Sequence, residues 1–230
     1  MKKNKFSNIT LLGVDCVDVE RLIKSAEICL SYFDFASVKI LSSIPSNNFD
    51  VIKIDPIRSR KEYSKFIIKK LNEYVDTDYV LIIQYDAFIL NPEAWTDKFL
   101  EYDYIGAPWW YEDDRNVGNG GFSLRSKKLL KVLAESSHIR KYQPEDHHIC
   151  RTYRKHLESK GIRFAPDELA ERFSIEGVQH KSRPLNNNVW SNQFGFHGLH
   201  KTNISKWLKS NPQYKSINNK LKSGYINDVK

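Results

Sequence analysis

The chain has few of the features that mark membrane-spanning, disulfide-rich or zinc-thiolate proteins. It has 3 cysteines in 230 residues, and since none of them forms a CxxC pair, the sequence indicates neither a disulfide framework nor a thiolate zinc site. No run approaches the ~20 apolar residues of a membrane helix, and the opening MKKNKF leads into a strand-like segment rather than a signal-peptide stretch. We therefore expect reduced thiols and a soluble, cytoplasmic protein.

Negative charge is also in deficit, which leaves a net charge of +8. A basic surface attracts phosphate-bearing partners, and nucleotide sugars, nucleic acid and anionic membrane surfaces all meet that description. Lysine is concentrated in the first residues, in residues 58–70 and after Lys201, where a solvated face is the simpler explanation. Charge alone therefore selects no partner.

Strand and helix patterns alternate through the first half of the chain. Short runs of branched apolar residues predict strands over residues 8–14, 38–41 and 51–54. Apolar residues at helical spacing predict helices over residues 19–33 and 63–75. Residues 79–85 form the most continuous apolar run, which is typical of a central parallel strand. The pattern predicts an α/β fold in which helices flank a mainly parallel sheet.

Two aspartates stand where predicted strands end. Asp15 follows the first strand and Asp86 follows the central one. Ligands of open α/β sheets bind beyond the carboxyl ends of the strands, so these side chains are the first candidates for a shared site. A turn or a helix cap is the structural alternative for each.

A glycine-dense loop and a tryptophan pair lie between residues 106 and 121. Glycines let the backbone approach a ligand closely, whereas an ordinary hairpin turn needs only one or two of them. The loop therefore predicts a binding role for Gly118, Asn119, Gly120 and Gly121. Trp109 and Trp110 either stack on a sugar ring or fill the core.

Two further features carry ionisable groups later in the chain. Glu145 and Asp146 follow Pro144 in what reads as the first turn of a helix, where acidic residues also complement the helix dipole. His197 stands between Phe196 and Gly198 in FGFHG, where a core histidine is the ordinary alternative to a ligand.

Taken in order, the segments QYDAF, YDYIGAPWW, VGNGGFSLRS, PEDHHIC and FGFHG resemble the GT-A superfamily of glycosyltransferases, particularly small bacterial and viral members. The resemblance extends over residues 8–200. It implies one Rossmann-like domain over residues 1–200, which a basic, partly helical tail over residues 201–230 would follow. It also implies transfer of a sugar from a nucleoside-diphosphate sugar, usually a UDP-sugar, in the cytoplasm of a bacterium or of a virus-infected host cell.

The resemblance implies a metal site. Gln84-Tyr85-Asp86 stands in the place of the superfamily's DxD motif, with glutamine instead of the first aspartate. Asp86 and His197 would then bind a divalent cation, Mn²⁺ or Mg²⁺, and the imidazole favours Mn²⁺. Gln84 and the glycine loop would bind the donor or the acceptor, and Asp15 would contact the nucleoside.

The resemblance also implies the chemistry. Glu145-Asp146 matches the superfamily's xED motif, in which the aspartate of an inverting enzyme takes the proton of the acceptor hydroxyl. Asp146 is thus the predicted base, and Glu145 is predicted to orient an acceptor hydroxyl. Bacterial glycans are the broad expectation for the acceptor, and the basic surface keeps open a hydroxymethylated base in viral DNA.

Two hypotheses from other functional classes compete with the glycosyltransferase hypothesis. A non-catalytic basic protein could bind nucleic acid through its lysines while its acidic residues serve as caps. A metal-dependent phosphodiesterase or nuclease could use the same carboxylates without any sugar donor. Neither accounts for the glycine loop together with the late histidine.

Overall fold

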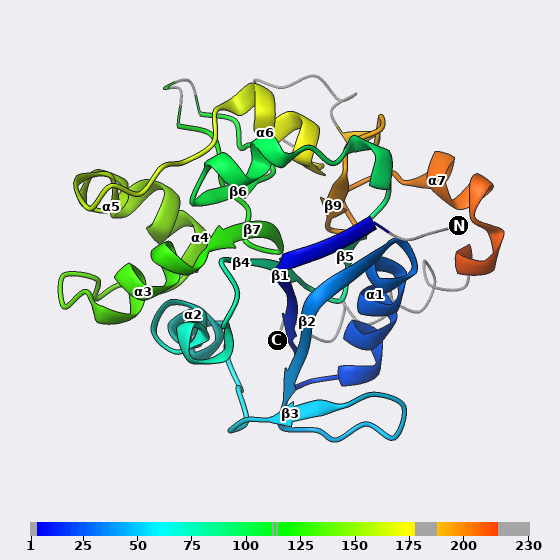
Figure 1. The fold of residues 1–230 in the computed structure, drawn as a ribbon, viewed down its shortest axis with the longest axis horizontal. Coiled ribbons are helices and arrows are strands. Elements are labelled where there is room, and N and C mark those ends of the chain that lie inside the picture. Colours follow the sequence, from blue (N-terminus) through cyan, green and yellow to red (C-terminus); the bar gives the residue numbers. More distant parts are fainter. Residues whose placement is uncertain (1–3, 112, 114, 178–187, 216–230) are drawn as a thin grey trace.

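A six-stranded sheet runs through the computed structural model, which describes residues 4–111, 113, 115–177 and 188–215 (Figure 1). The strand order is β3-β2-β1-β4-β7-β6. Strand β1 pairs in parallel with β2 and β4, and β2 pairs in parallel with β3, whereas β7 is antiparallel to both β4 and β6. The bounds are β1 Asn4–Val14, β2 Phe33–Ser42, β3 Val51–Lys53, β4 Tyr79–Ile83, β6 Tyr104–Gly106 and β7 Phe122–Ser126. The predicted α/β fold with a mainly parallel sheet is confirmed.

The direction of strand addition reverses between β1 and β4. The chain passes from β1 through β2 to the edge strand β3, and it then returns to place β4 on the other side of β1. Such a reversal opens a crevice beyond the carboxyl ends of the two strands, and this crevice is the usual ligand site of open α/β sheets. Asp15 and Gln84 directly follow these two ends.

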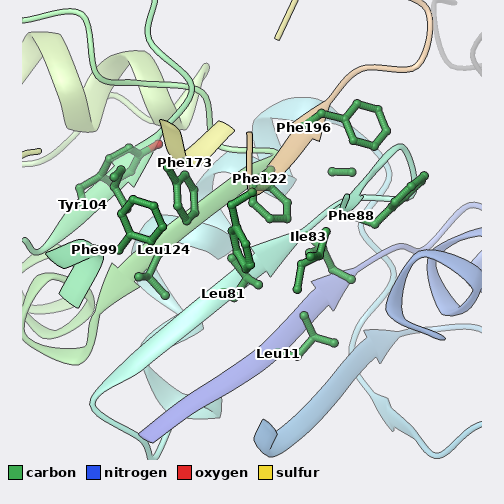
Figure 2. Close-up of a cluster of buried hydrophobic side chains, with 14 of the residues drawn as sticks. Leu11, Leu81, Ile83, Phe88, Phe99, Tyr104, Phe122, Leu124, Phe173 and Phe196 are labelled. Atoms are coloured by element: carbon green, nitrogen blue, oxygen red, sulfur yellow. The ribbon is translucent and has the colours of Figure 1, made fainter. Parts of the chain in front are cut away.

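Alternate residues of the central strands face two separate layers of helices. Leu11, Leu81 and Ile83 point to the same side as Leu22 of α1 (Val19–Tyr32), and Figure 2 shows them with the aromatic residues of that core. Leu12, Val80 and Ile82 point to the other side. There they meet α2 (Arg60–Lys69), the 3₁₀ turn η1 (Leu71–Tyr74) and α3 (Lys127–Glu135). Each fully buried Leu or Ile side chain contributes roughly 1.5–3 kcal/mol.

Capping residues fix where these helices begin. Asp18 accepts a hydrogen bond from the backbone N–H of Arg21, and Ser59 accepts one from that of Glu62. Ser126, the N-cap of α3, accepts one from that of Leu129. The predicted helix over residues 63–75 is divided between α2 and η1, and the predicted strand over residues 79–85 ends earlier, at Ile83.

A second sheet of three short strands lies beside the first, in the order β5-β9-β8. The strands are β5 (Ala87–Ile89), β8 (Ser174–Glu176) and β9 (Gly195–His197). Phe88 packs edge-on against Phe196 at 4.8 Å between ring centroids and against Trp207 of α7 (Ser205–Ser210) at 5.3 Å. This described part of the predicted tail is thus packed on the core, and residues 216–230 of the tail lie outside the described residues.

The predicted acidic helix begins at Glu145 as expected. It runs through α4 (Glu145–His147), the π-helical turn η4 (His148–Thr152) and α5 (Arg154–Ser159), and Ile149, Cys150, Tyr153 and Leu157 are buried beneath it. The remaining elements are α6 (Asp167–Phe173) and the 3₁₀ turns η2 (Pro92–Ala94), η3 (Asp97–Glu101) and η6 (Pro212–Tyr214). Among the described helices, none has the length and apolarity to cross a bilayer.

Candidate active site

Antiparallel pairing brings the glycine loop beside the end of β4. Ile83 pairs with Phe122, so the residues that follow β4 lie next to those that precede β7. The backbone N–H of Gln84 donates to the carbonyl of Gly121 at 3.0 Å. The segment of Gln84 to Asp86 and the loop of Gly118 to Gly121 therefore lie side by side.

The small sheet brings the late histidine to the same place. In its register Ala87 pairs with His197, and the backbone N–H of Gly198 donates to the carbonyl of Asp86 at 3.1 Å. As a result, Nε2 of His197 lies 3.5 Å from Oδ1 of Asp86 and 3.1 Å from Oε1 of Gln84. The two side chains predicted to bind one cation are thus in contact, although 110 residues separate them in the sequence.

The glycines are needed because charged groups pack against their α-carbons. A Cβ on Gly121 would lie 2.3 Å from Nε2 of His197, and a Cβ on Gly120 would lie 2.3 Å from Oε1 of Glu145. The backbone N–H of Gly120 donates to Oδ2 of Asp146 at 3.1 Å. The loop is therefore a thin partition that has the imidazole on one side and the two acids on the other.

Charge dominates the imidazole side of this partition. Burial by itself would lower the pKa of His197, but the carboxylates of Asp86 and Glu176 outweigh it and raise the pKa to about 10. Burial would raise the pKa of Glu176, yet the hydrogen bond and charge of His197 lower it to about 2. The pKa of Asp86 is lowered as well, because the charge of His197 outweighs burial. The ring of His197 thus lies between two carboxylates, which favour its protonated form.

The acidic side contains a buried arginine. Arg125 is fully buried in β7, where its Nε donates to Oγ of Ser123 at 3.1 Å and its guanidinium lies 5.0 Å from the ring centroid of Tyr104. Its Nη2 is 3.6 Å from Oε1 of Glu145. Burial and the neighbouring charge of Asp146 raise the pKa of Glu145 to about 7, against the opposing effect of Arg125.

The residues on the imidazole side fit a divalent cation. Oδ1 of Asp86 is buried and has no hydrogen-bond partner in the described part of the chain, and it faces a ring nitrogen that is a usual metal ligand. Within the described ranges, no group of three or more His, Cys, Asp or Glu side chains is arranged to hold a metal. One carboxylate and one imidazole suit Mn²⁺ or Mg²⁺ when substrate phosphates and water complete the shell.

A known protein family matches most of the residues described above. The model of the family described as "Protein of unknown function (DUF5672)" matches residues 47–197. The chain belongs to the DUF5672 family. The matched residues include every group of the partition described above, from Gln84 to His197, and they do not include Asp15. No curated protein sequence matches the chain.

Several solved structures are similar to this DUF5672 chain at low identity. A mannosyltransferase of Pyrobaculum calidifontis, PcManGT, in complex with GDP-Man and Mn²⁺, has a TM-score of 0.44 and 8% identity over 68% of this chain and 53% of its own. An active-site mutant of LgtC has a TM-score of 0.45 and 13% identity over 89% of this chain and 95% of its own. The glycosyltransferase GlyE of Streptococcus pneumoniae TIGR4, without ligand, has a TM-score of 0.43 and 13% identity over 98% and 64%. The chain thus spans about half of the length of the mannosyltransferase, or 53% of it.

Asp15 directly follows β1 and is already engaged by neighbouring groups. Its carboxylate accepts from the backbone N–H groups of Val17 at 2.8 Å and Asp18 at 3.0 Å, and from Nε of Arg21 at 2.7 Å. The guanidinium of Arg21 in turn covers the ring of Tyr85 at 3.8 Å. Asp15 therefore orders the loop that packs beside the Gln84 to Asp86 segment, and its contact with a nucleoside stays a prediction.

The two tryptophans differ in their surroundings. Trp109 is 7% exposed, and its ring packs on Gly118, where a Cβ would lie 2.5 Å from the indole. Trp110 is half-buried and stacks on Tyr111 at 5.5 Å between ring centroids. Trp109 thus fills the core, whereas Trp110 is half-buried, and a ligand-stacking role for Trp110 stays a prediction.

Sequence patterns missed three residues of the site. Glu176 lies in a three-residue strand with no readable period, and its Oε1 is 3.2 Å from Nδ1 of His197. Tyr63 counted as an apolar helix position, yet its hydroxyl accepts from Nε2 of Gln84 at 3.1 Å. Arg125 could have been recognised, because it is a charged residue among the uncharged residues of β7.

Proposed function

We propose that the chain is a metal-dependent glycosyltransferase that moves a sugar from a nucleoside-diphosphate sugar to a hydroxyl acceptor with inversion. The observation that carries this proposal is the thin partition itself. Asp86 and His197 meet on one side of Gly120 and Gly121, and Asp146 is held on the other. The order of the motifs along the chain, which resembles that of the GT-A superfamily, supports the same function.

Asp146 is the proposed base. Each of its carboxylate oxygens accepts one backbone N–H, from Gly120 at 3.1 Å and from His147 at 2.7 Å, so its orientation is fixed while lone pairs stay available. In the transfer, the acceptor hydroxyl gives its proton to Asp146 and its oxygen bonds to the anomeric carbon of the donor. The bond from that carbon to the phosphate oxygen breaks, and the nucleoside diphosphate leaves with the electron pair.

Asp86 and His197 are the residues that would hold the cation, Mn²⁺ or Mg²⁺, which when bound neutralises charge on the departing diphosphate. Imidazole is a better ligand for Mn²⁺ than for Mg²⁺, so we favour Mn²⁺. Asp86 contributes a buried oxygen that accepts no hydrogen bond from the residues that the structure describes, and His197 contributes Nε2.

The donor and the acceptor share the rest of the crevice. We assign the donor sugar to the backbone of Gly118, Asn119, Gly120 and Gly121 and to the amide of Gln84. Trp110 and Glu145 are assigned to the acceptor, and Asp15 to the nucleoside. A UDP-sugar is the proposed donor, and a glycan or a hydroxymethylated base in DNA is the proposed acceptor.

The test is nucleoside-diphosphate release by the purified chain with Mn²⁺ and a panel of nucleotide sugars, with glycans or hydroxymethylated DNA as acceptors. Asp146→Asn removes the proton acceptor but keeps the shape, so we expect turnover to fall by about 10²-fold or more while donor affinity changes little. Asp76→Asn, which alters only an exposed pair with Lys39, is the matched control. Full turnover by Asp146→Asn refutes the base, and hydrolysis of DNA without any sugar donor supports the phosphodiesterase reading instead.

A further inference from the structure

Glu176 approaches His197 from the strand on its far side. The parallel pairing of β8 with β9 sets Glu176 beside His197, and side chains of paired neighbours project to the same face of a sheet. The two nitrogens of the ring therefore face different groups. Nδ1 is 3.2 Å from Oε1 of Glu176, an ion-pair contact, whereas Nε2 is 3.5 Å from Oδ1 of Asp86 and 3.1 Å from Oε1 of Gln84.

We propose that Glu176 is a positioning residue for the cation site: its carboxylate accepts the Nδ1 proton of His197 and so directs the Nε2 lone pair to the cation beside Asp86. The inference rests on the proposed cation site. Histidines that bind metals commonly donate their other N–H to a carboxylate, which fixes the tautomer and increases the basicity of the ligating nitrogen.

The ring is held on more than one side, which is what this role requires. The α-carbon of Gly121 packs on the ring so closely that a Cβ would lie 2.3 to 2.6 Å from three of its atoms. The backbone carbonyl of His197 accepts from the hydroxyl of Thr202 at 2.8 Å, and that hydroxyl accepts from the N–H of Gly177 at 2.9 Å. The end of β8 and the end of β9 are thus tied together directly behind the imidazole.

Glu176 is itself fixed by groups that do not touch Asp86. The side chain of Asn119 helps to lower the pKa of its carboxyl group, and Nζ of Lys201 lies 3.4 Å from Oε1. Lys201 is more exposed, so its ion pair with Glu176 is weakened by solvent. Two variants therefore separate these contacts. Glu176→Gln removes the charge that faces the imidazole, and Lys201→Gln removes only the exposed ion pair.

The experiment is Mn²⁺ binding to the whole chain, measured from the electron paramagnetic resonance signal of the free ion, with no donor or acceptor present. We expect Glu176→Gln to weaken Mn²⁺ binding by about 10 to 100-fold, the usual effect of losing such a carboxylate. We expect Lys201→Gln to change it by no more than about 2-fold, because the screened pair contributes little. Thermal unfolding in EDTA checks that both variants are folded.

A second measurement separates positioning from general destabilisation. In Mg²⁺-loaded protein, the ¹⁵N spectrum of the His197 ring should show the proton on Nδ1 in the unaltered chain and in Lys201→Gln, and a mixture of tautomers in Glu176→Gln. Unchanged Mn²⁺ affinity in Glu176→Gln, equal losses in both variants, or a wild-type chain that binds no Mn²⁺ would each overturn the inference. Normal Mn²⁺ binding that depends on Glu176 but is accompanied by no sugar transfer would refute the proposed function and leave this inference standing.

Discussion

The two sides of the glycine partition handle buried charge in different ways. On the imidazole side, Asp86, His197 and Glu176 alternate in sign, and neighbouring charged atoms are 3.5 and 3.2 Å apart. On the acidic side, the closest approach of Arg125 to Glu145 is 3.6 Å, and both terminal nitrogens of Arg125 have no hydrogen-bond partner among the described residues.

Their pKa values reflect the same contrast. On the imidazole side, the pKa of Glu176 is lowered to about 2. On the acidic side, the pKa of Glu145 is raised to about 7. In the first cluster the charges alternate in sign, and we expect a cation bound by Nε2 of His197 to displace its proton. In the second, Glu145 lies beside another acid, Asp146, and its ion pair with Arg125 is longer, at 3.6 Å.

The largest expected effect is on the acidic side. Arg125→Met leaves the carboxyl group of Glu145 buried without its counter-charge, and removing one partner of a buried pair typically costs about 3–5 kcal/mol. We expect a loss of this size in the free energy of unfolding, measured by urea denaturation at pH 8. The double variant Arg125→Met with Glu145→Gln should recover a large part of it. Equal losses in the single and double variants would show that packing of the guanidinium, rather than charge, is what matters.

A pH dependence is the second effect. The pKa of Glu145 is raised on folding, so the folded state favours the protonated acid, and the resulting stability is present below the unfolded pKa and is lost as pH rises to about 7. The charged and titratable groups facing it are Arg125 from β7, Tyr63 from α2, Tyr104 from β6 and its neighbour Asp146.

The measurement is the free energy of unfolding of the unaltered chain minus that of Glu145→Gln, between pH 4.5 and 7.5. We expect this difference to fall by roughly 3 kcal/mol across the window, since each unit of pKa shift is worth about 1.4 kcal/mol. Groups on the imidazole side are common to both proteins and cancel. A flat or rising difference would mean that Arg125 stabilises the ionised acid fully, and the contrast between the two sides would then disappear.

Part of this site could be read from the sequence. The continuous apolar run that forms β4 is long enough to mark a central strand, so the placement of Asp86 near its carboxyl end followed from the pattern. The helix that begins at Glu145 was readable for a similar reason, because its buried face keeps helical spacing. These features are local, and each depends only on neighbours within a few turns.

The contact between Asp86 and His197 could be predicted only through the family resemblance. It depends on the register of β5 with β9, and strands of three residues carry too little alternation to specify a partner. Glu176 was missed for the same reason, since its role depends on the neighbouring register of β8. Tyr63 was missed because a tyrosine in an apolar stripe gives no sign of where its hydroxyl will point.

The smallest expected effect on stability comes from substituting the two neighbouring glycines of the partition, Gly120 and Gly121. A methyl group on Gly121 collides with His197, and one on Gly120 collides with Glu145 and Arg125, so Gly121→Ala and Gly120→Ala should each cost about 1–3 kcal/mol of stability through overpacking. Their functional effects should differ. Gly121→Ala displaces the imidazole and should abolish Mn²⁺ binding, whereas Gly120→Ala should leave Mn²⁺ affinity within about 3-fold and reduce turnover, because Asp146 loses its backbone donor geometry. Paired titrations of Mn²⁺ and assays of nucleoside-diphosphate release on the two variants measure this. Loss of Mn²⁺ binding in both would mean that the loop responds as one rigid unit, and that its two sides are not independent.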